Sequence, residues 1–380
     1  MSASTAPPPL TARHATLQDL TGLLRGQHAR KVDVTAPAAL IRSAGGNLVL
    51  DGTVPQLTPD GVTMTAGSYR PTEVFDEGIA GKLGVPAAYL RKMRDAGAAG
   101  LYDANLNEWL ARDDRTFLIR CLAGDGGPGI ARAFLSDQFQ VIDHLDTLFA
   151  VLDGIRASGY AAQVEDCDLT GRRMYVRFRC DEVTAMAPLL LAGYRSPFTG
   201  AYGADNPVVS AGFIFANSET GCGAWSLIPR LVARVCGNGM TITRDAARIV
   251  HRGDRHEPGV TWHWSADTGQ KELALLTARV RDTVTNFLSA GYVERAVRDM
   301  EARAGHKVEP VTAIQHVAAR LRYTQAQQEE FLAHFIAGGS VTAGGIMHAV
   351  TSAAQVQPDG DTASQLENTA LQALELAAAL

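Results

Sequence analysis

Residues 217–240 read NSETGCGAWSLIPRLVARVCGNGM, and this stretch anchors the interpretation of the whole chain. Arg230 and Arg234 are four residues apart, a spacing that places two side chains on one face of a helix. The Gly-Asn-Gly sequence at 237–239 follows, and both residue types tolerate the left-handed backbone at which helices end. The spacing therefore predicts a short helix with an arginine face and a glycine stop.

Three motifs in chain order carry a family resemblance. The first is Leu83–Tyr89 with Asn105–Trp109, and the middle one is Arg132–Asp137 with Ile142 and Asp143. The last comprises Asn217, Ser218, Glu219, Gly221, Arg234, Cys236, Asn238 and Gly239. Together they resemble the phage- and plasmid-borne family catalogued as domain of unknown function 932, although Gly237 stands where that pattern has threonine. The resemblance covers roughly Ala80 to Arg255. It implies a mobile-element context, and a distant kinship with phage single-strand annealing recombinases is the further expectation.

Composition bounds the class of protein. The chain has 380 residues, 46% of them hydrophobic, enough for two or three subdomains. No apolar run is long enough to cross a membrane, and the N-terminus lacks a charged-then-apolar signal sequence. The five cysteines show neither a Cys-x-x-Cys pair nor paired histidine spacing. We therefore expect a cytoplasmic protein without a disulfide framework, a metal site or a cofactor.

Hydrophobic periodicity predicts an α+β fold. Strand-like pairs of segments are 116–122 with 130–136, 160–166 with 172–180, and 208–217 with 224–228. Helical spacing dominates before residue 112 and again from residue 270 onward. We expect a central antiparallel sheet with packed helices, a helical N-terminal part and an all-helical C-terminal part. The predicted division is a disordered tail at 1–13, a helical/β part at 14–112, a central α+β binding domain at 113–265 and a helical domain at 266–380.

The sharpest chemical signal is Arg172–Cys180, which reads RRMYVRFRC. Alternate residues of a strand share a face, so one face would carry Arg173, Tyr175, Arg177 and Arg179. These side chains recur roughly every 7 Å along a strand. Guanidinium groups bind phosphates through paired hydrogen bonds, and a tyrosine ring can stack on a base. The alternative is a solvated sheet face whose arginines pair with nearby acids.

Charge segregation supports the first interpretation. The net charge is −5, yet residues 171–260 hold eleven arginines, no lysine and seven acids. The last thirty residues hold four acids and no basic residue. Arg244, Arg248, Arg252 and Arg255 would share one side of a helix capped by Thr243. The predicted nucleic-acid-binding set is Arg132, Arg173, Tyr175, Arg177, Arg179, Arg230, Arg234, Arg244 and Arg248.

Catalytic motifs are missing from the sequence. The glycine-rich segment 124–129 lacks the Lys-Ser/Thr of an ATP-binding loop, and no serine lies in a Gly-x-Ser-x-Gly elbow. The histidines at 251, 256 and 263 fit no tetrahedral ligand spacing. Asp137, Asp143 and Asp146 could hold Mg²⁺ in a nuclease, but turn and capping roles are favoured.

These patterns lead to a functional hypothesis without a catalytic residue. Arginines would neutralise phosphates, leave the bases exposed for pairing, and act repeatedly along a homo-oligomer. The expected function is ATP-independent binding of single-stranded DNA, with strand annealing during phage or plasmid recombination as its extension. The alternative is a structural or host-interaction protein of a mobile element that binds no nucleic acid. A metal-dependent nuclease is the third reading.

Overall fold

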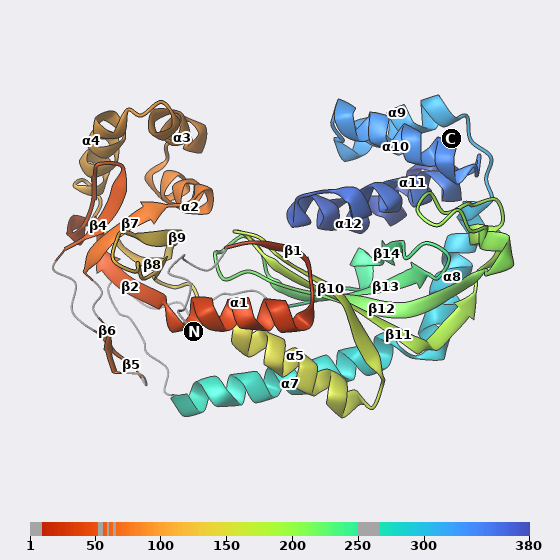
Figure 1. Ribbon diagram of the computed structural model, residues 1–380, viewed down its shortest axis with the longest axis horizontal. Helices are drawn as coiled ribbons and strands as arrows, with labels where there is room; N and C mark the ends of the chain where they lie inside the picture. Colours follow the sequence, from red (N-terminus) through yellow and green to blue (C-terminus); the bar gives the residue numbers. More distant parts are fainter. Residues whose placement is uncertain (1–9, 52–55, 59–60, 64–65, 250–265) are drawn as a thin grey trace.

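The structure is a computed structural model, and it describes residues 10–51, 56–58, 61–63, 66–249 and 266–380. It has an α+β fold with two main sheets, one at each end of an arched molecule (Figure 1). The predicted fold class is confirmed, including the all-helical C-terminal part.

The larger sheet is antiparallel throughout and has the order β1-β10-β11-β12-β13-β14, with β15 also paired to β13. Its strands are β1 (Ala12–Ala15), β10 (Ala162–Leu169), β11 (Met174–Met186), β12 (Val208–Asn217), β13 (Trp225–Ala233), β14 (Gly239–Thr241) and β15 (Ala247–Ile249). The hairpin predicted around residues 168–171 is present as β10 and β11, and the apolar strand at 208–217 pairs with β13 as predicted.

Three helices cover one face of this sheet: α1 (Leu17–Ala29), α5 (His144–Ser158) and α7 (Ala266–Phe287). Their apolar residues, among them Leu20, Val151 and Val280, share a core with Phe178 and Phe213 of the sheet. Helices α5 and α7 cross closely at Gly154, where an added Cβ would lie 2.7 Å from the carbonyl oxygen of Thr277. Any larger side chain at this position would force the two helices apart.

The C-terminal helices gather at one end of the larger sheet. They are α8 (Ala290–Ala304), α9 (Pro310–Leu321), α10 (Gln325–Gly338), α11 (Ala343–Val356) and α12 (Gly360–Ala378). Helix α11 is almost wholly buried, because small residues let its neighbours approach from all sides. Helix α12 lies across the sheet face opposite to α7, above β13 and β14 in Figure 1.

The smaller sheet has the order β2-β8-β9-β7-β4-β3. Its strands are β2 (Lys31–Pro37), β3 (Ile41–Ala44), β4 (Asn47–Leu50), β7 (Gly67–Pro71), β8 (Thr116–Leu122) and β9 (Gly129–Ser136), and helices α2 (Glu73–Leu83), α3 (Ala87–Asp95) and α4 (Ala99–Leu110) pack against it. Strands β8 and β9 form the predicted hairpin, but they pair with N-terminal strands. The predicted division after residue 112 therefore falls inside the unit built on this smaller sheet.

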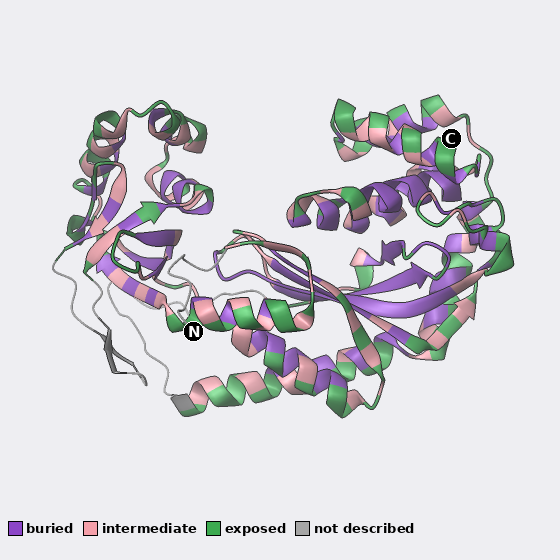
Figure 2. Ribbon diagram, in the orientation of Figure 1, coloured by how far each residue is buried: buried purple, intermediate pink, exposed green. Residues whose placement is uncertain are grey.

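Short elements complete the described chain. They are β5 (Gln56–Thr58), β6 (Gly61–Thr63), α6 (Pro188–Leu191) and single 3-10 turns at Ala38–Leu40, Gly203–Asp205 and Thr243–Asp245. Figure 2 shows that β12 and β13 form the buried centre of the larger sheet: β13 is buried along its whole length, and β12 at every residue after Val208.

Within the described residues, no helix combines the length and the hydrophobicity that crossing a bilayer requires.

Candidate nucleic-acid interface

Strand β11 has the two faces that its sequence predicts. Met174, Val176, Phe178 and Cys180 lie in the hydrophobic core. The intervening residues Arg173, Tyr175, Arg177 and Arg179 belong to the opposite face, over which α12 lies. The alternation is confirmed, but the polar face is not open to solvent: Arg177 is only 3% exposed.

The acidic last helix supplies the cover. The Nε of Arg177 donates to both carboxylate oxygens of Glu367 at 3.1 Å, and its Nη2 donates to one of them at 3.0 Å. The hydroxyl of Tyr175 donates to Asp361 at 2.9 Å. Two of the four acids in the base-free C-terminal segment thus bind the predicted arginine-aromatic face.

Further carboxylates meet Arg177 from β10. Its Nη1 donates to Asp166 at 2.8 Å and to Asp168 at 2.6 Å. Arg13 of β1 donates to the same Asp168 oxygen at 2.6 Å. Burial by itself would raise the pKa of Asp168, but Arg177 and Arg13 outweigh burial and hold that pKa below its usual value.

Arg230 does not lie on a helix. Residues 225–233 form β13, because this apolar segment pairs with β12 over eight consecutive residues and is buried on both sides. Long-range strand pairing therefore overrides the four-residue spacing that suggested a helix. The guanidinium of Arg230 is buried between Glu165 and Glu367, and its Nε has no hydrogen-bond partner in the described part of the chain.

Arg234 follows β13 and lies beside Arg179 instead of beside Arg230. Its Nε donates to Ser210 at 2.8 Å and its Nη2 to the backbone oxygen of Asp181 at 2.9 Å. Arg179 donates to the Asp181 carboxylate at 2.9 Å and to Glu165 at 2.8 Å. Both side chains are about one third exposed, so two accessible guanidiniums converge on one carboxylate.

A cavity of about 430 Å³, here called the arginine groove, opens on this face of the sheet. Arg13, Arg177 and Arg230 line it together with Glu165, Asp166 and Glu367. Phe198, which is 43% exposed, lies at its rim. The groove therefore joins guanidiniums from three strands to an accessible aromatic ring.

The loop that carries Phe198 is held against the turn after β13. The hydroxyl of Thr199 donates to the carbonyl oxygen of Val235 at 3.2 Å. In the same loop the guanidinium of Arg195 stacks over the exposed ring of Tyr202, 5.5 Å from its centroid. These aromatic residues were not singled out in the sequence, since no periodic pattern marks a loop.

Arg173 and Arg132 have separate surroundings. Arg173 lies 5.5 Å from the centroid of Tyr175 and donates to the backbone oxygen of Ala224 at 3.0 Å. Arg132 lies on β9, in the smaller sheet, and donates to Glu219 at 2.7 Å. The structure therefore places Arg132 away from the arginine groove.

Glu219, from the motif at 217–221, is the centre of a buried joint between the two sheets. It accepts from Arg132 and from the backbone nitrogen of His144 at 2.5 Å, while its own carbonyl accepts from Arg120 at 3.1 Å. Arg120 also donates to Asp143 at 2.6 Å. Burial opposes ionisation of Glu219, but His144, Arg132 and Arg120 lower its pKa overall. Arg120 was missed in the sequence, although a charge inside the apolar run TFLIRCL is typical of a buried ion pair.

Residues Cys236–Gly239, at the end of the same motif, dock the C-terminal helices. The amide of Asn238 is fully buried and donates to the hydroxyls of Tyr194 at 3.1 Å and Ser352 at 3.0 Å. Gly237 has a φ of 71°, the left-handed conformation that its position in the motif predicts. Both ends of the motif at 217–239 therefore act as structural joints in this molecule.

The predicted helix beginning at Thr243 is absent from the described residues. Thr243–Asp245 form one 3-10 turn and Ala247–Ile249 form β15, which pairs with β13. Arg244 donates to Asp299 at 3.0 Å, and Arg248 is exposed on β15. Arg252 and Arg255, like the histidines at 251, 256 and 263, lie outside the described residues.

One cluster in the described residues has metal-ligand character. His14, Asp166 and Asp168 bring ligand atoms within 4.8 Å of one another. Arg13 and Arg177 already donate to Asp168, so a cation bound there would meet two guanidiniums. Asp143, one of the three aspartates considered for a nuclease, is also engaged, since Lys31 and Arg120 both bind it.

No protein-family model matches the chain, and comparisons with curated proteins and with solved structures return no match.

Proposed function

We propose that the protein binds single-stranded DNA without ATP, with the arginine groove and its rim as the binding surface. The observation that carries the proposal is the convergence of Arg179 and Arg234 beside a groove whose rim holds Phe198. Single-strand binding requires cations that follow the phosphates and rings on which bases stack. This surface offers both within one exposed corner of the larger sheet.

The chemistry of binding is an exchange of anions. Guanidinium groups pair with carboxylates and phosphates through the same parallel hydrogen bonds, so a phosphate can take the place of the Asp181 carboxylate, which pairs with Arg179 and lies 3.5 Å from Arg234. Phe198 and Tyr202 would then stack on neighbouring bases. Such binding uses no reactive group and no nucleotide cofactor. Annealing adds the requirement that several subunits present the strand together, for which a homo-oligomer is part of the proposal.

A second candidate function has its own support. Carboxylates pair with six of the predicted arginines, at positions 132, 177, 179, 230, 234 and 244. Internal neutralisation of this kind is also what a structural or host-interaction protein would need to keep a basic sheet folded. In that case the arginines stabilise the docking of α12 and bind nothing outside the chain.

Electrophoretic mobility shifts with single- and double-stranded oligonucleotides separate the two candidates. The proposal predicts a shift of the single strand without ATP, stronger than that of the duplex. An annealing assay with two complementary strands, also without ATP, tests the extension to annealing. A folded protein that shifts neither oligonucleotide would support the interaction protein instead.

A further inference from the structure

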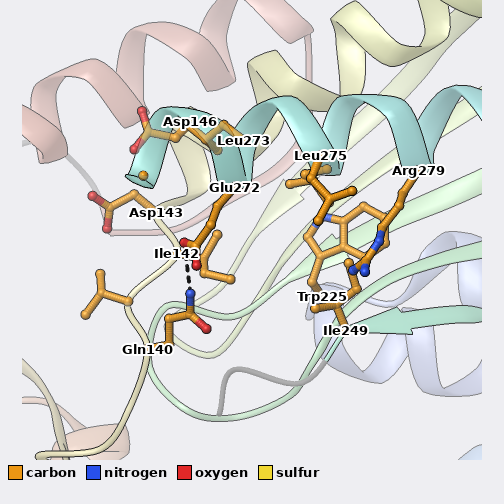
Figure 3. A pocket seen from close by; sticks show the side chains of 13 residues that line it. Gln140, Ile142, Asp143, Asp146, Trp225, Ile249, Glu272, Leu273, Leu275 and Arg279 are labelled. Atoms are coloured by element: carbon orange, nitrogen blue, oxygen red, sulfur yellow. Dashed lines mark hydrogen bonds between the residues drawn. The ribbon is translucent and has the colours of Figure 1, made fainter. Parts of the chain in front are cut away.

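A second pocket lies on the other side of β13, between the larger sheet, α7 and the segment after β9 (Figure 3). Its volume is about 320 Å³, within the usual range for small-molecule sites. Trp225 and Ile249 come from the sheet, and Leu273, Leu275 and Leu276 come from α7. Their apolar side chains form a slot suited to a flat ring.

The indole of Trp225 offers an unused donor in this pocket. The residue is 2% exposed, and its Nε1 has no hydrogen-bond partner among the described residues. Figure 3 shows this nitrogen on the ring edge nearest Leu275. A buried donor without a partner costs about 1–3 kcal/mol, so an acceptor supplied by a ligand would relieve a real penalty.

The charged groups of the pocket are separated by sign. Asp143 and Asp146 lie at one end, Glu272 lies beside them, and Arg279 lies at the other end next to Trp225. Glu272 and Arg279 are seven residues apart on α7, which places them on one face about 10 Å apart. No ion pair joins Arg279 to any residue in the described ranges, and only Gln140, at 3.0 Å, donates to Glu272. Burial raises the pKa of Asp146, and no ion pair joins this carboxylate to another described residue.

We propose that this pocket binds a guanine nucleotide, with the base packed on the leucines of α7, its edge towards the Nε1 of Trp225, and the phosphate on Arg279. Guanine presents N1–H and N2–H₂ side by side, two donors that a carboxylate such as Glu272 accepts together, whereas adenine and uracil lack this pair. Its O6 and N7 are acceptors for the Trp225 donor. The inference does not rest on the proposed DNA binding, because the pocket and the arginine groove lie on opposite faces of β13.

Isothermal titration of the full chain with guanosine, adenosine and uridine monophosphates tests the site. The expected result is that the guanosine nucleotide binds more tightly than the other two. Arg279→Ala and Glu272→Gln should each lower the affinity for guanosine monophosphate roughly tenfold, because each removes one charge-assisted contact. Arg281→Ala is the matched control, because Arg281 is exposed on the same helix and pairs with Asp282 outside the pocket.

Trp225→Phe keeps an aromatic ring and removes the indole donor. This variant should bind guanosine monophosphate more weakly without a change in its circular dichroism spectrum. Absence of binding, equal binding of the three nucleotides, or equal effects of Arg279→Ala and Arg281→Ala would overturn the proposal. So would displacement of a bound oligonucleotide by the nucleotide, since that places the nucleotide in the arginine groove. Nucleotide binding by a protein that binds no oligonucleotide would leave this pocket standing and refute the proposed function alone.

Discussion

Arg177 and Glu367, 190 residues apart in the chain, form a buried bidentate ion pair that fixes the last helix to the centre of the larger sheet. The same carboxylate lies 3.8 Å from Arg230. One acid of α12 thus neutralises guanidiniums from two strands of the predicted binding face. This relationship links the stability of the C-terminal helices to the charge of the arginine groove.

Glu367→Gln is expected to lower stability and to raise DNA affinity together. Removing one partner of a buried ion pair costs about 3–5 kcal/mol in the free energy of unfolding, measured by urea denaturation. In the fraction that stays folded, the groove gains one net positive charge, so fluorescence anisotropy should report tighter binding of a single-stranded oligonucleotide.

Glu375→Gln is the matched control for this substitution. It makes the same charge change on the same helix, and no ion pair joins Glu375 to another described residue. Stability and affinity should both stay close to those of the unchanged protein. Equal gains in affinity for the two variants would mean that overall charge, and not the groove, governs binding.

The double variant Arg179→Ala/Arg234→Ala should weaken single-strand binding and make it less sensitive to salt. Each phosphate contact on a single strand contributes about 0.7 to the slope of log K against log salt, so losing two contacts should reduce the slope by about 1.4. Arg112→Ala/Arg156→Ala removes two exposed, ion-paired arginines elsewhere and serves as the control. A slope that falls equally in both double variants would exclude the corner at Asp181 as the contact.

Local sequence predicted the strands better than it predicted their surroundings. The alternation in 172–180 gave the correct two faces of β11, because side-chain direction in a strand depends only on the two-residue period. That α12 covers one face depends on a contact between Arg177 and Glu367, which no local pattern encodes. The same limit explains β13: the spacing of Arg230 and Arg234 suits a helix, and only pairing with β12 selects the strand. The hairpin of β8 and β9 was predicted correctly but assigned to the central domain. It belongs to the smaller sheet because β8 pairs with β2, and this long-range pairing is also not encoded in a local pattern.

Stability should fall on acidification below about pH 6.5. Burial lowers the pKa of His144 and of His348 to about 4, from an ordinary value of 6.5. Between these two pH values the unfolded chain binds protons that the folded chain does not. Each histidine therefore lowers the free energy of unfolding by up to about 3 kcal/mol as the pH falls. Glu219 and Asp143, whose pKa values are lowered in the fold, add a further loss below about pH 4.5.

Urea denaturation at pH 6.5 and pH 4.5 measures this dependence. His348→Gln should reduce the difference between the two pH values by roughly half, because it removes one of the two buried imidazoles. His306→Gln changes an exposed histidine and should leave the difference unaltered. An unchanged difference in His348→Gln would show that His348 is not the group that titrates.

Oligomerisation is expected to involve the C-terminal helices. Ile336 and Leu380 are 70% and 63% exposed, and Val311 and Val341 are also exposed in this part of the chain. Exposed apolar residues of this size favour association with a second copy. Multi-angle light scattering at micromolar concentration should give a mass above that of one chain, and Ile336→Asp should lower it. A monomer mass with and without oligonucleotide would contradict this expectation.

Fluorescence anisotropy of a labelled single-stranded oligonucleotide, titrated with the protein at several salt concentrations without ATP, tests the central claim most directly. The account predicts saturable binding, an affinity that falls linearly on a log–log plot with a slope of about −2 or steeper, and a shallower slope in Arg179→Ala/Arg234→Ala. A folded protein that leaves the anisotropy unchanged at low salt would contradict it.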